Sequence, residues 1–324
     1  MKKITLVVMF SVAMLALIAA PEQSFGAPLE RAALIKLADD YFAALVAHNP
    51  KAVPLADNVK MVEQVKRIKP GEGLWKTATS GTTAFKIVVP DTVSQQVGGV
   101  VILGVNGKPA QFGFRLKVED GKITEAEHLI VEIGNPDNPM LQTVRPAIPM
   151  EIPYEYRDSR GRLIWIAKSY YDALDLNNGS LSPFASDCER RENGMRTAPF
   201  GGPSLGGAGI PGAKPGPPSL LGMQDCASQL NTGTFQYIDV IANRRVLIAD
   251  ELTGLAVGFS HFHHSMKQKK FTILNVPGDE ERDMSNQKPF DMPALHIYKI
   301  WGGQIHEIEA IGIMADYNSP TGWE

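Results

Sequence analysis

The residues best suited to chemistry are a charged pair in the second half of the chain, Arg190 and Glu192. Side chains two residues apart on a β-strand point to the same face, so a strand here would place the guanidinium beside the carboxylate. The pair could prepare a carboxylate for proton transfer or bind an anionic group of a substrate. It could also be a structural ion pair, or both side chains could lie in solvent if the register differs. We predict catalytic roles, with Glu192 moving a proton and Arg190 stabilising negative charge.

Asn193 follows Glu192 directly, and Gly194 permits a bend in the chain after it. The Asn193 amide could orient a substrate oxygen. It could equally cap a turn, which is the commoner use of Asn before Gly. We include Asn193 among the predicted catalytic residues, as a second group that holds a developing oxyanion.

Three histidines cluster at 261, 263 and 264. On a strand, His261 and His263 would share one face, and His264 would lie on the other. Two histidines at this spacing can chelate a metal, with a third ligand from far away in the chain, such as His296 or a carboxylate. One histidine could instead serve as a general acid or base, or all three could be exposed at a strand end. We predict an acid/base role for His264 and no metal site.

Two further groups are candidates for substrate contacts. Tyr170, Tyr171 and Asp172 lie on a predicted helix, where we expect Tyr170 in the core and the other two at a pocket rim. Arg244 and Arg245 could form a charge cluster at a hairpin end, but one arginine turned inward would add an anion site. We therefore predict substrate binding by Tyr171, Asp172 and Arg245.

The sequence contains two cysteines, Cys188 and Cys226. An even number of cysteines in an exported chain favours a disulfide. Residues 198–222, between them, include six Pro and eight Gly without a periodic apolar pattern. A crosslink would restrict the high conformational entropy of such a loop. We predict a disulfide; two buried free thiols or a reactive Cys188 are the alternatives.

A duplication supplies the elements that must position these residues. Seven positions are identical at an offset of 129 residues: Tyr41/Tyr170, Ala44/Ala173, Leu45/Leu174, Asn49/Asn178, Pro54/Pro183, Ala56/Ala185 and Glu63/Glu192. Residues 117–127 and 299–309 repeat at an offset of 182, so the second copy has about 53 additional residues. Each copy starts with apolar residues at helical spacing, over 31–46 in the first copy, and continues with strand-like segments. This order predicts an α+β fold.

The N-terminal residues and the composition indicate where the protein works and what it contacts. Lys2 and Lys3 precede an apolar run and small residues near Gly26, which predicts a signal peptide over 1–26 and a periplasmic or secreted protein. An uncleaved anchor is the alternative. No later apolar run is long enough to span a membrane. The formal net charge of −3 argues against nucleic acid as a partner.

The two copies resemble the nuclear-transport-factor-2-like (NTF2-like) superfamily, which includes SnoaL-like and ketosteroid-isomerase-like proteins. The resemblance rests on Tyr-Phe-x-Ala-Leu, the Asn turn, Pro-x-Ala and the closing hairpin with Gly-Lys-Ile-x-Glu. It implies two tandem cones, each a curved antiparallel sheet around a pocket, with helices packed on the sheet and closing the pocket. Segments such as Gly73-Leu-Trp75 and Ser319-Pro-Thr-Gly-Trp323 resemble, more narrowly, a family of secreted fungal and bacterial proteins with this duplicated cone. His264 follows the Phe-x-His pattern of that family.

We therefore expect a first cone over 28–134, a Pro-rich linker over 135–158 and a second cone over 159–324. The resemblance implies acid/base chemistry on a small organic substrate in the second cone, of the lyase, dehydratase or isomerase type, without a cofactor. No nucleotide, phosphate or zinc-protease motif is present in the sequence. The alternatives are a non-catalytic binding protein and a structural envelope protein that pairs as a homodimer through its sheets.

Overall fold

The computed structural model describes residues 27–199, 220–278 and 280–324. The predicted signal peptide over 1–26 and most of the Gly/Pro-rich loop over 198–222 lie outside these ranges. Among the helices that the structure describes, none is long and apolar enough to cross a bilayer.

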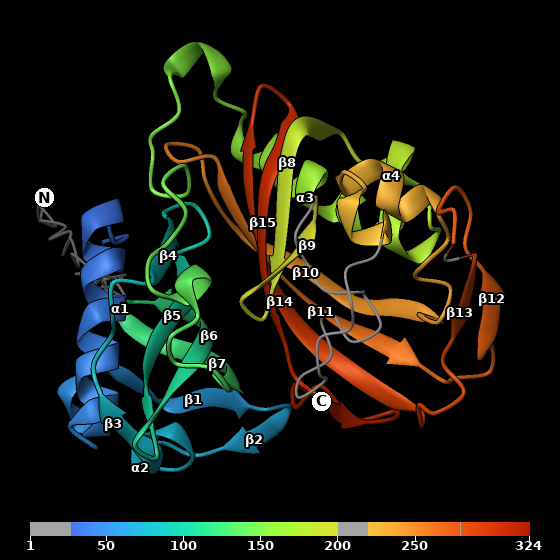
Figure 1. The fold of residues 1–324 in the computed structure, drawn as a ribbon. Coiled ribbons are helices and arrows are strands. Elements are labelled where there is room, and N and C mark those ends of the chain that lie inside the picture. Colours follow the sequence, from blue (N-terminus) through green and yellow to red (C-terminus); the bar gives the residue numbers. More distant parts are fainter. Residues whose placement is uncertain (1–26, 200–219, 279) are drawn as a thin grey trace, which may run out of the picture.

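The first half forms one long helix, two short helical segments and one curved seven-stranded sheet (Figure 1). Its elements are α1 (Arg31–Val46), η1 (Pro50–Ala52), β1 (Leu55–Glu63), β2 (Lys66–Ile68), α2 (Leu74–Thr77), β3 (Ala78–Ser80), β4 (Lys86–Asp91), β5 (Gln96–Val105), β6 (Lys108–Glu119) and β7 (Lys122–Glu132). The strand order is β2-β1-β7-β6-β5-β3, and β4 also pairs with β5. Apolar residues of α1 at the expected spacing, among them Leu34, Tyr41 and Leu45, are buried against this sheet.

The second half repeats the plan. Its elements are α3 (Arg160–Asp175), η4 (Gly179–Leu181), β8 (Phe184–Glu192), β9 (Met195–Ala198), η5 (Leu220–Met223), α4 (Cys226–Asn231), β10 (Val240–Asp250), β11 (Leu255–His264), β12 (Lys270–Thr272), β13 (Glu281–Asp283), β14 (Phe290–Trp301), β15 (Gln304–Gly312) and β16 (Ala315–Asp316). The strand order is β10-β11-β14-β15-β8-β9, and β16 pairs with β14. Ser159 caps α3 by accepting a hydrogen bond from the Arg162 amide.

The predicted α+β fold of two tandem domains, each with helices packed on a curved sheet, is confirmed, with one correction. Each sheet is mixed rather than antiparallel, because β1 runs parallel to β7 and β8 runs parallel to β15. The remaining ladders of the two sheets are antiparallel. The first strand after each long helix joins the sheet beside the last long strand and runs parallel to it.

One predicted strand boundary is wrong. The pattern predicts separate strands over 235–242 and 245–249, whereas residues 232–237 form turns and a single strand, β10, covers Val240–Asp250. An irregularity in its pairing with β11 lies between Ala242 and Arg245, and Asn243 there has a φ of 50°. A bulge of this kind interrupts the alternation that the sequence pattern relies on. Arg244 and Arg245 therefore lie inside a strand and not at a hairpin end.

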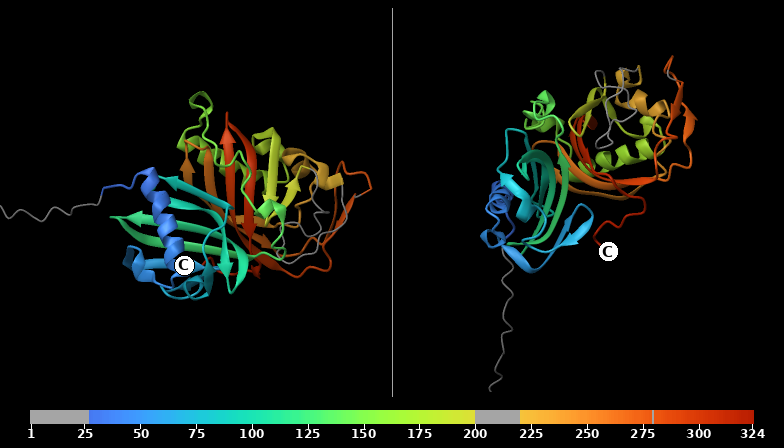
Figure 2. Two further views of the ribbon diagram at one scale, coloured as in Figure 1. Left: turned by 60° about the vertical axis from the view of Figure 1, so that its left-hand side comes forward. Right: turned by 60° about the horizontal axis from the view of Figure 1, so that its bottom comes forward.

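The two sheets pack back to back, with α1 and α3 on the outer sides (Figures 1 and 2). One hydrophobic cluster joins both sheets and includes Ile87, Val100 and Leu129 from the first and Ile248, Phe259 and Leu295 from the second. A Cβ atom at Gly98 would lie 2.7 Å from Cδ1 of Ile248, and one at Gly113 would lie 2.5 Å from Cδ1 of Ile311. These glycines permit the close approach. The face through which a lone cone could pair with another is thus covered within one chain.

Three Arg–carboxylate pairs also join the two halves: Arg31–Asp250 at 2.8 Å, Arg160–Asp91 at 2.8 Å and Arg245–Glu127 at 2.6 Å. The carboxylates of Asp91 and Glu127 are almost fully buried. Buried carboxylates require partners of this kind, because an unpaired charge away from water is costly. These pairs fix the second cone on the first.

The Pro-rich segment over 135–158 packs on the face of the second sheet that meets the first sheet, where Leu141 and Ile148 join the shared hydrophobic cluster. It contains η2 (Pro139–Leu141) and η3 (Tyr154–Tyr156). Arg145 forms ion pairs with Glu307 at 3.3 Å and Glu309 at 3.2 Å, both on β15. Nζ of Lys299 donates to the carbonyl oxygen of Met150 at 2.6 Å, and burial lowers the pKa of Lys299 to about 8.

The buried carboxyl of Glu309 predicts a pH dependence of stability. Burial raises the pKa of Glu309 from 4.5 to about 7, against the opposing charge of Arg145. Because the folded state holds the proton more tightly, this stabilising contribution is complete below about pH 4.5 and is lost as the pH rises through about 7. Gln imitates the protonated group, so we expect Glu309→Gln to flatten the decline in the free energy of unfolding by up to about 3 kcal/mol.

Urea unfolding of both proteins at several pH values measures this effect. Glu132→Gln is the control, since Glu132 is a largely exposed carboxylate paired with Lys108. Parallel pH profiles for wild type and Glu309→Gln would show that Glu309 does not hold the proton.

Candidate functional site

A pocket opens into the second cone at the end of β8. Its empty volume is about 510 Å³, part of which is open to solvent. The polar or ionisable residues that line it are Tyr170, Glu192, Asn193, Tyr237, His264 and His296. Its apolar lining includes Leu174, Phe235, Ile238, Phe262, Met292 and Ile311. Three of the four predicted catalytic residues, Glu192, His264 and Asn193, therefore meet at one cavity.

Arg190 lies behind Glu192 and does not line the cavity. The side chain is fully buried, and its Nε is 3.0 Å from Oε1 of Glu192 and 2.9 Å from Oγ1 of Thr197. Nη2 donates to Oε1 of Gln229, and the guanidinium lies over the ring of Phe235. These contacts fix the guanidinium, which in turn holds the Glu192 carboxylate at the pocket.

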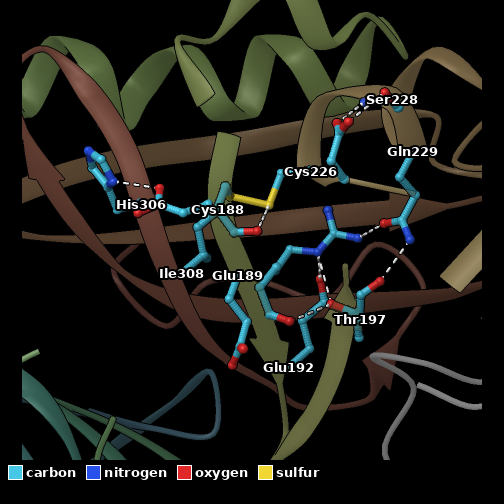
Figure 3. Close-up of a disulfide and its surroundings, with 12 residues drawn as sticks. Cys188, Glu189, Glu192, Thr197, Cys226, Ser228, Gln229, His306 and Ile308 are labelled. Atoms are coloured by element: carbon cyan, nitrogen blue, oxygen red, sulfur yellow. Dashed lines mark hydrogen bonds and ion pairs between the residues drawn. A yellow bond between two sulfur atoms is a disulfide. The ribbon is translucent and has the colours of Figure 1, made fainter. Parts of the chain in front are cut away.

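The disulfide supports this arrangement from one side. Cys188 and Cys226 are bonded, which confirms the prediction, and the bridge ties β8 to α4 (Figure 3). Gln229 extends from α4 toward Arg190, and its amide nitrogen donates to the carbonyl oxygen of Thr197 at 2.7 Å. The crosslink therefore holds in place the helix that positions Arg190.

Glu63, at the matching position of the first cone, has a different and structural role. Its carboxylate accepts the Leu74 amide at 3.0 Å and lies 3.0 Å from Nδ1 of His128. Nε2 of His128 is 2.9 Å from the Tyr41 hydroxyl. A Cβ atom at Gly73 would collide with Glu63, so the turn before α2 closes tightly over the carboxylate. Glu63 thus supports α2 within a filled interior.

Strand register shows what separates the two cones. Glu63 pairs with His128 on β7, whereas Glu192 pairs with Ala310 on β15. On the next strand of each sheet, Phe114 of β6 lies opposite His128, and His296 of β14 lies opposite Ala310. The imidazole that occupies the first cone is therefore replaced by a methyl group beside Glu192.

The same exchange recurs at three more interior positions. In register, Phe112 corresponds to Ala294, Ile130 to Gly312 and Val101 to Ser260. Each first-cone residue has the larger apolar side chain. The smaller residues open the second cone, and Ala294, Ala310 and Gly312 all line its pocket. A protein interior is otherwise close-packed, so coordinated losses of volume on one wall form a built cavity.

Two histidines at the pocket are neutral at physiological pH. Burial lowers the pKa of His264 to about 4, and burial together with the charge of Arg190 lowers that of His296 to about 3. The Nδ1 atoms of both are buried without a hydrogen-bond partner. Buried polar atoms are nearly always paired, so unpaired ring nitrogens at a cavity wall are ready to bond a ligand or water.

Tyr170 is buried in the core of the second cone, as predicted, and it also lines this pocket. Burial raises the pKa of Tyr170 well above its ordinary value. The hydroxyl therefore stays protonated and can donate a hydrogen bond. The charges of Arg190 and Glu192 both act on it. Tyr170 and His296 are functional candidates that the sequence analysis missed as pocket residues.

Asn193 is at the pocket, but its amide is engaged. Its Oδ1 accepts the Gly312 amide at 2.9 Å, and its Nδ2 donates to the Gly312 carbonyl oxygen at 3.2 Å. Asn193 also has a φ of 49°. These contacts favour the turn-forming role over the predicted orientation of a substrate oxygen.

The structure does not bring the three predicted substrate-binding residues to this pocket. Tyr171 is buried against Tyr298, with its hydroxyl close to Gly258. Asp172 is largely exposed and pairs with Arg244 at 2.5 Å. Arg245 points to the other side of the sheet, where it pairs with Glu127 of the first cone. Strict alternation along a strand predicts which face of the sheet each side chain occupies. The bulge in β10 moves the Arg245 side chain to the other face.

The fold and this pocket define a protein with two tandem α+β cones, of which the second has a pocket beside its carboxylate. The chain belongs to the family described as "Domain of unknown function (DUF8021)", which matches residues 27–130 and 156–312. No functionally curated protein is significantly similar to the chain in sequence.

Several solved structures are similar to this chain over part of its length. A protein from Xanthomonas campestris pv. campestris, provisionally described as a polyketide cyclase, is 17% identical, with a TM-score of 0.28, over 47% of this chain and 90% of its own. One from Kribbella flavida, provisionally described as a ketosteroid isomerase, is 18% identical, with a TM-score of 0.26, over 37% and 90%. IdmH from Streptomyces antibioticus, provisionally described as a polyketide cyclase, is 15% identical, with a TM-score of 0.27, over 46% and 91%. Similarities this low do not indicate a reaction for this chain.

Proposed function

We propose that the second cone binds a small organic molecule and that Glu192 moves a proton on it, in a reaction of the isomerase or lyase type. One observation carries the proposal. Both cones have a glutamate at the equivalent position, but beside Glu192 the second cone has the small residues Ala310 and Ala294 where the first has His128 and Phe112. A site that keeps its carboxylate and loses the side chains around it has room for a substrate at the carboxylate.

The lining indicates the class of substrate. Aromatic and aliphatic side chains form most of the wall, which suits a compact, largely apolar molecule. The protonated Tyr170 hydroxyl, and His264 or His296 as neutral groups, are available to hydrogen-bond one substrate oxygen. A carbonyl compound with an acidic neighbouring C–H matches this set, since removal of that proton places negative charge on the oxygen.

The reaction proceeds without a group from outside the chain in this proposal. The Glu192 carboxylate, held by Arg190, accepts the proton from carbon, and the hydroxyl of Tyr170 donates a hydrogen bond to the forming enolate oxygen. Return of the proton to another carbon completes an isomerisation; loss of a leaving group completes an elimination. Asn193 positions β15 through Gly312 and does not contact the oxyanion.

Export is part of the same proposal. The basic and apolar leader over 1–26 is typical of a signal peptide, and a disulfide forms and persists in oxidising compartments such as the periplasm or the outside of the cell.

The experiment is hydrogen–deuterium exchange at carbon, because it detects proton abstraction whatever the later step. We expect the wild-type protein in D₂O to accelerate exchange next to the carbonyl of at least one member of a panel of aromatic and alicyclic ketones, followed by NMR. Panel members that bind in the pocket but never exchange faster than in buffer would contradict catalysis. That result would favour the second candidate, a binding protein, for which the largely apolar wall is the supporting observation.

A further inference from the structure

A second cluster of ionisable side chains lies on the opposite face of the second sheet. His261 and His263 are two residues apart on β11 and therefore share one face of the sheet. Asp291 of β14 lies directly opposite His263. Nε2 of His261 is 3.1 Å from Oδ2 of Asp291, and Nδ1 of His263 is 2.9 Å from Oδ1. The three potential ligand atoms all lie within 4.8 Å of one another.

Two paired strands hold these side chains in place. The imidazole rings of His261 and His263 are stacked with their centroids 4.9 Å apart. Asp291 is fully buried, and the side chain of His263 is 21% exposed, so the cluster is rigid at its base and accessible at one edge. Ligands from rigid strands meet the geometric demands of a metal better than ligands from loops do.

The charge of Asp291 requires explanation. Within the part of the chain that the structure describes, no Lys or Arg forms an ion pair with it; its oxygens face the two histidines and the Ser319 amide. A buried carboxylate normally pairs with a cation or coordinates a metal. A divalent ion bound between the three side chains would supply that positive charge.

We propose that His261, His263 and Asp291 form a binding site for a divalent first-row transition ion, with Zn²⁺ as the preferred occupant. Two imidazole nitrogens and one carboxylate oxygen are a common ligand set for Zn²⁺. Zinc bonds of about 2.0–2.1 Å place tetrahedral ligand atoms about 3.3 Å apart. The two hydrogen-bonded separations, 3.1 and 2.9 Å, involve different oxygens of Asp291, and the three ligand atoms lie within 4.8 Å of one another. Side-chain rotations that bring these atoms together admit the ion.

The fourth position lies toward the C-terminal segment. Oγ of Ser319 is 3.3 Å from Nε2 of His261, and β16 pairs with β14 beside Asp291. Ser319 or water completes the coordination. The bound ion therefore ties residues 315–319 to the sheet, beside the crevice between the cones that Arg245 and His261 line.

The full-length protein without an affinity tag, stripped with a chelator and dialysed, provides the test. Isothermal titration with ZnCl₂ is expected to show one ion per chain, and Zn²⁺ is expected to raise Tm because it binds the folded state. Co²⁺ is expected to give the visible absorption of a four-coordinate site. We expect His263→Ala and Asp291→Asn each to weaken Zn²⁺ binding more than about 100-fold, since loss of a ligand exceeds the 10–100-fold effect of an outer-shell change.

The control is His306→Ala. His306 and Asp187 form another histidine–carboxylate pair, at 2.7 Å, but lack a second histidine. This variant is expected to bind Zn²⁺ as the wild type does. Failure of the wild type to bind Zn²⁺ would overturn the proposal, as would equal binding by wild type, His263→Ala and Asp291→Asn. If Asp291→Asn does not fold, two variants on β11, His263→Ala and His261→Gln, replace it in the test. Zn²⁺ binding by both that equals wild-type binding would then overturn the proposal.

Discussion

Glu192→Gln is expected to lower the rate of carbon–hydrogen exchange by at least about 100-fold while leaving the fold intact. Gln keeps the size of the side chain and can still accept a hydrogen bond from Arg190, but it cannot take up a proton from carbon. The loss should appear in kcat rather than in substrate affinity, because the missing event belongs to the transition state. Exchange kinetics by NMR, at saturating concentrations of the best panel compound, measure it.

The duplication offers a matched control, Glu63→Gln. Glu63 occupies the equivalent position but supports α2 and His128 inside a filled cone. We expect Glu63→Gln to lower the melting temperature and to leave the exchange rate unchanged when measured well below that temperature. Full activity in Glu192→Gln, or an equal loss in Glu63→Gln, would remove Glu192 from the mechanism.

Loss of the disulfide is expected to produce the largest change in stability. Cys188 and Cys226 are 38 residues apart, and the chain-entropy relation for a loop of that length gives a stabilisation of about 4 kcal/mol. We expect the Cys188→Ala/Cys226→Ala variant to lose about 2–4 kcal/mol of unfolding free energy in urea denaturation. It should also lose activity, since α4 carries Gln229, which holds Arg190.

Reduction provides the control for this prediction. Dithiothreitol should destabilise the wild type to the level of the double variant and should have no effect on the variant itself. An unchanged unfolding midpoint on reduction of the wild type would contradict a stabilising role for the bridge.

The fold was predictable because both halves of the sequence show the same order of a helix followed by strands. The spacing of Leu34, Tyr41 and Leu45 gives the first helix, and the hairpin turns at Asp120-Gly121 and Gly302-Gly303 fix the pairing of the last strands. The parallel pairing of β1 with β7 was not predictable, since alternation along one strand carries no information about its neighbour's direction.

The site was predicted in part, for a definable reason. Glu192 follows from strand alternation around a pocket, and His264 follows from the Phe-x-His resemblance; the structure places both at the pocket. Tyr170 and Tyr171 are adjacent on α3, and helical spacing alone does not decide which one faces a cavity. The clearest signal was left unused: at the offset of 182, His128 and Phe112 align with Ala310 and Ala294. That comparison identifies the open cone from sequence.

Binding to Ala310→His tests most directly the claim that the second cone is the functional one. The new imidazole would occupy the space that His128 fills in the first cone and would contact Glu192. By isothermal titration, we expect wild type to bind one equivalent of the best panel compound. We expect Ala310→His, folded by circular dichroism, to bind it at least tenfold more weakly, a loss of about 1.4 kcal/mol or more. Unchanged affinity and stoichiometry in the folded variant would place the ligand elsewhere and contradict the account.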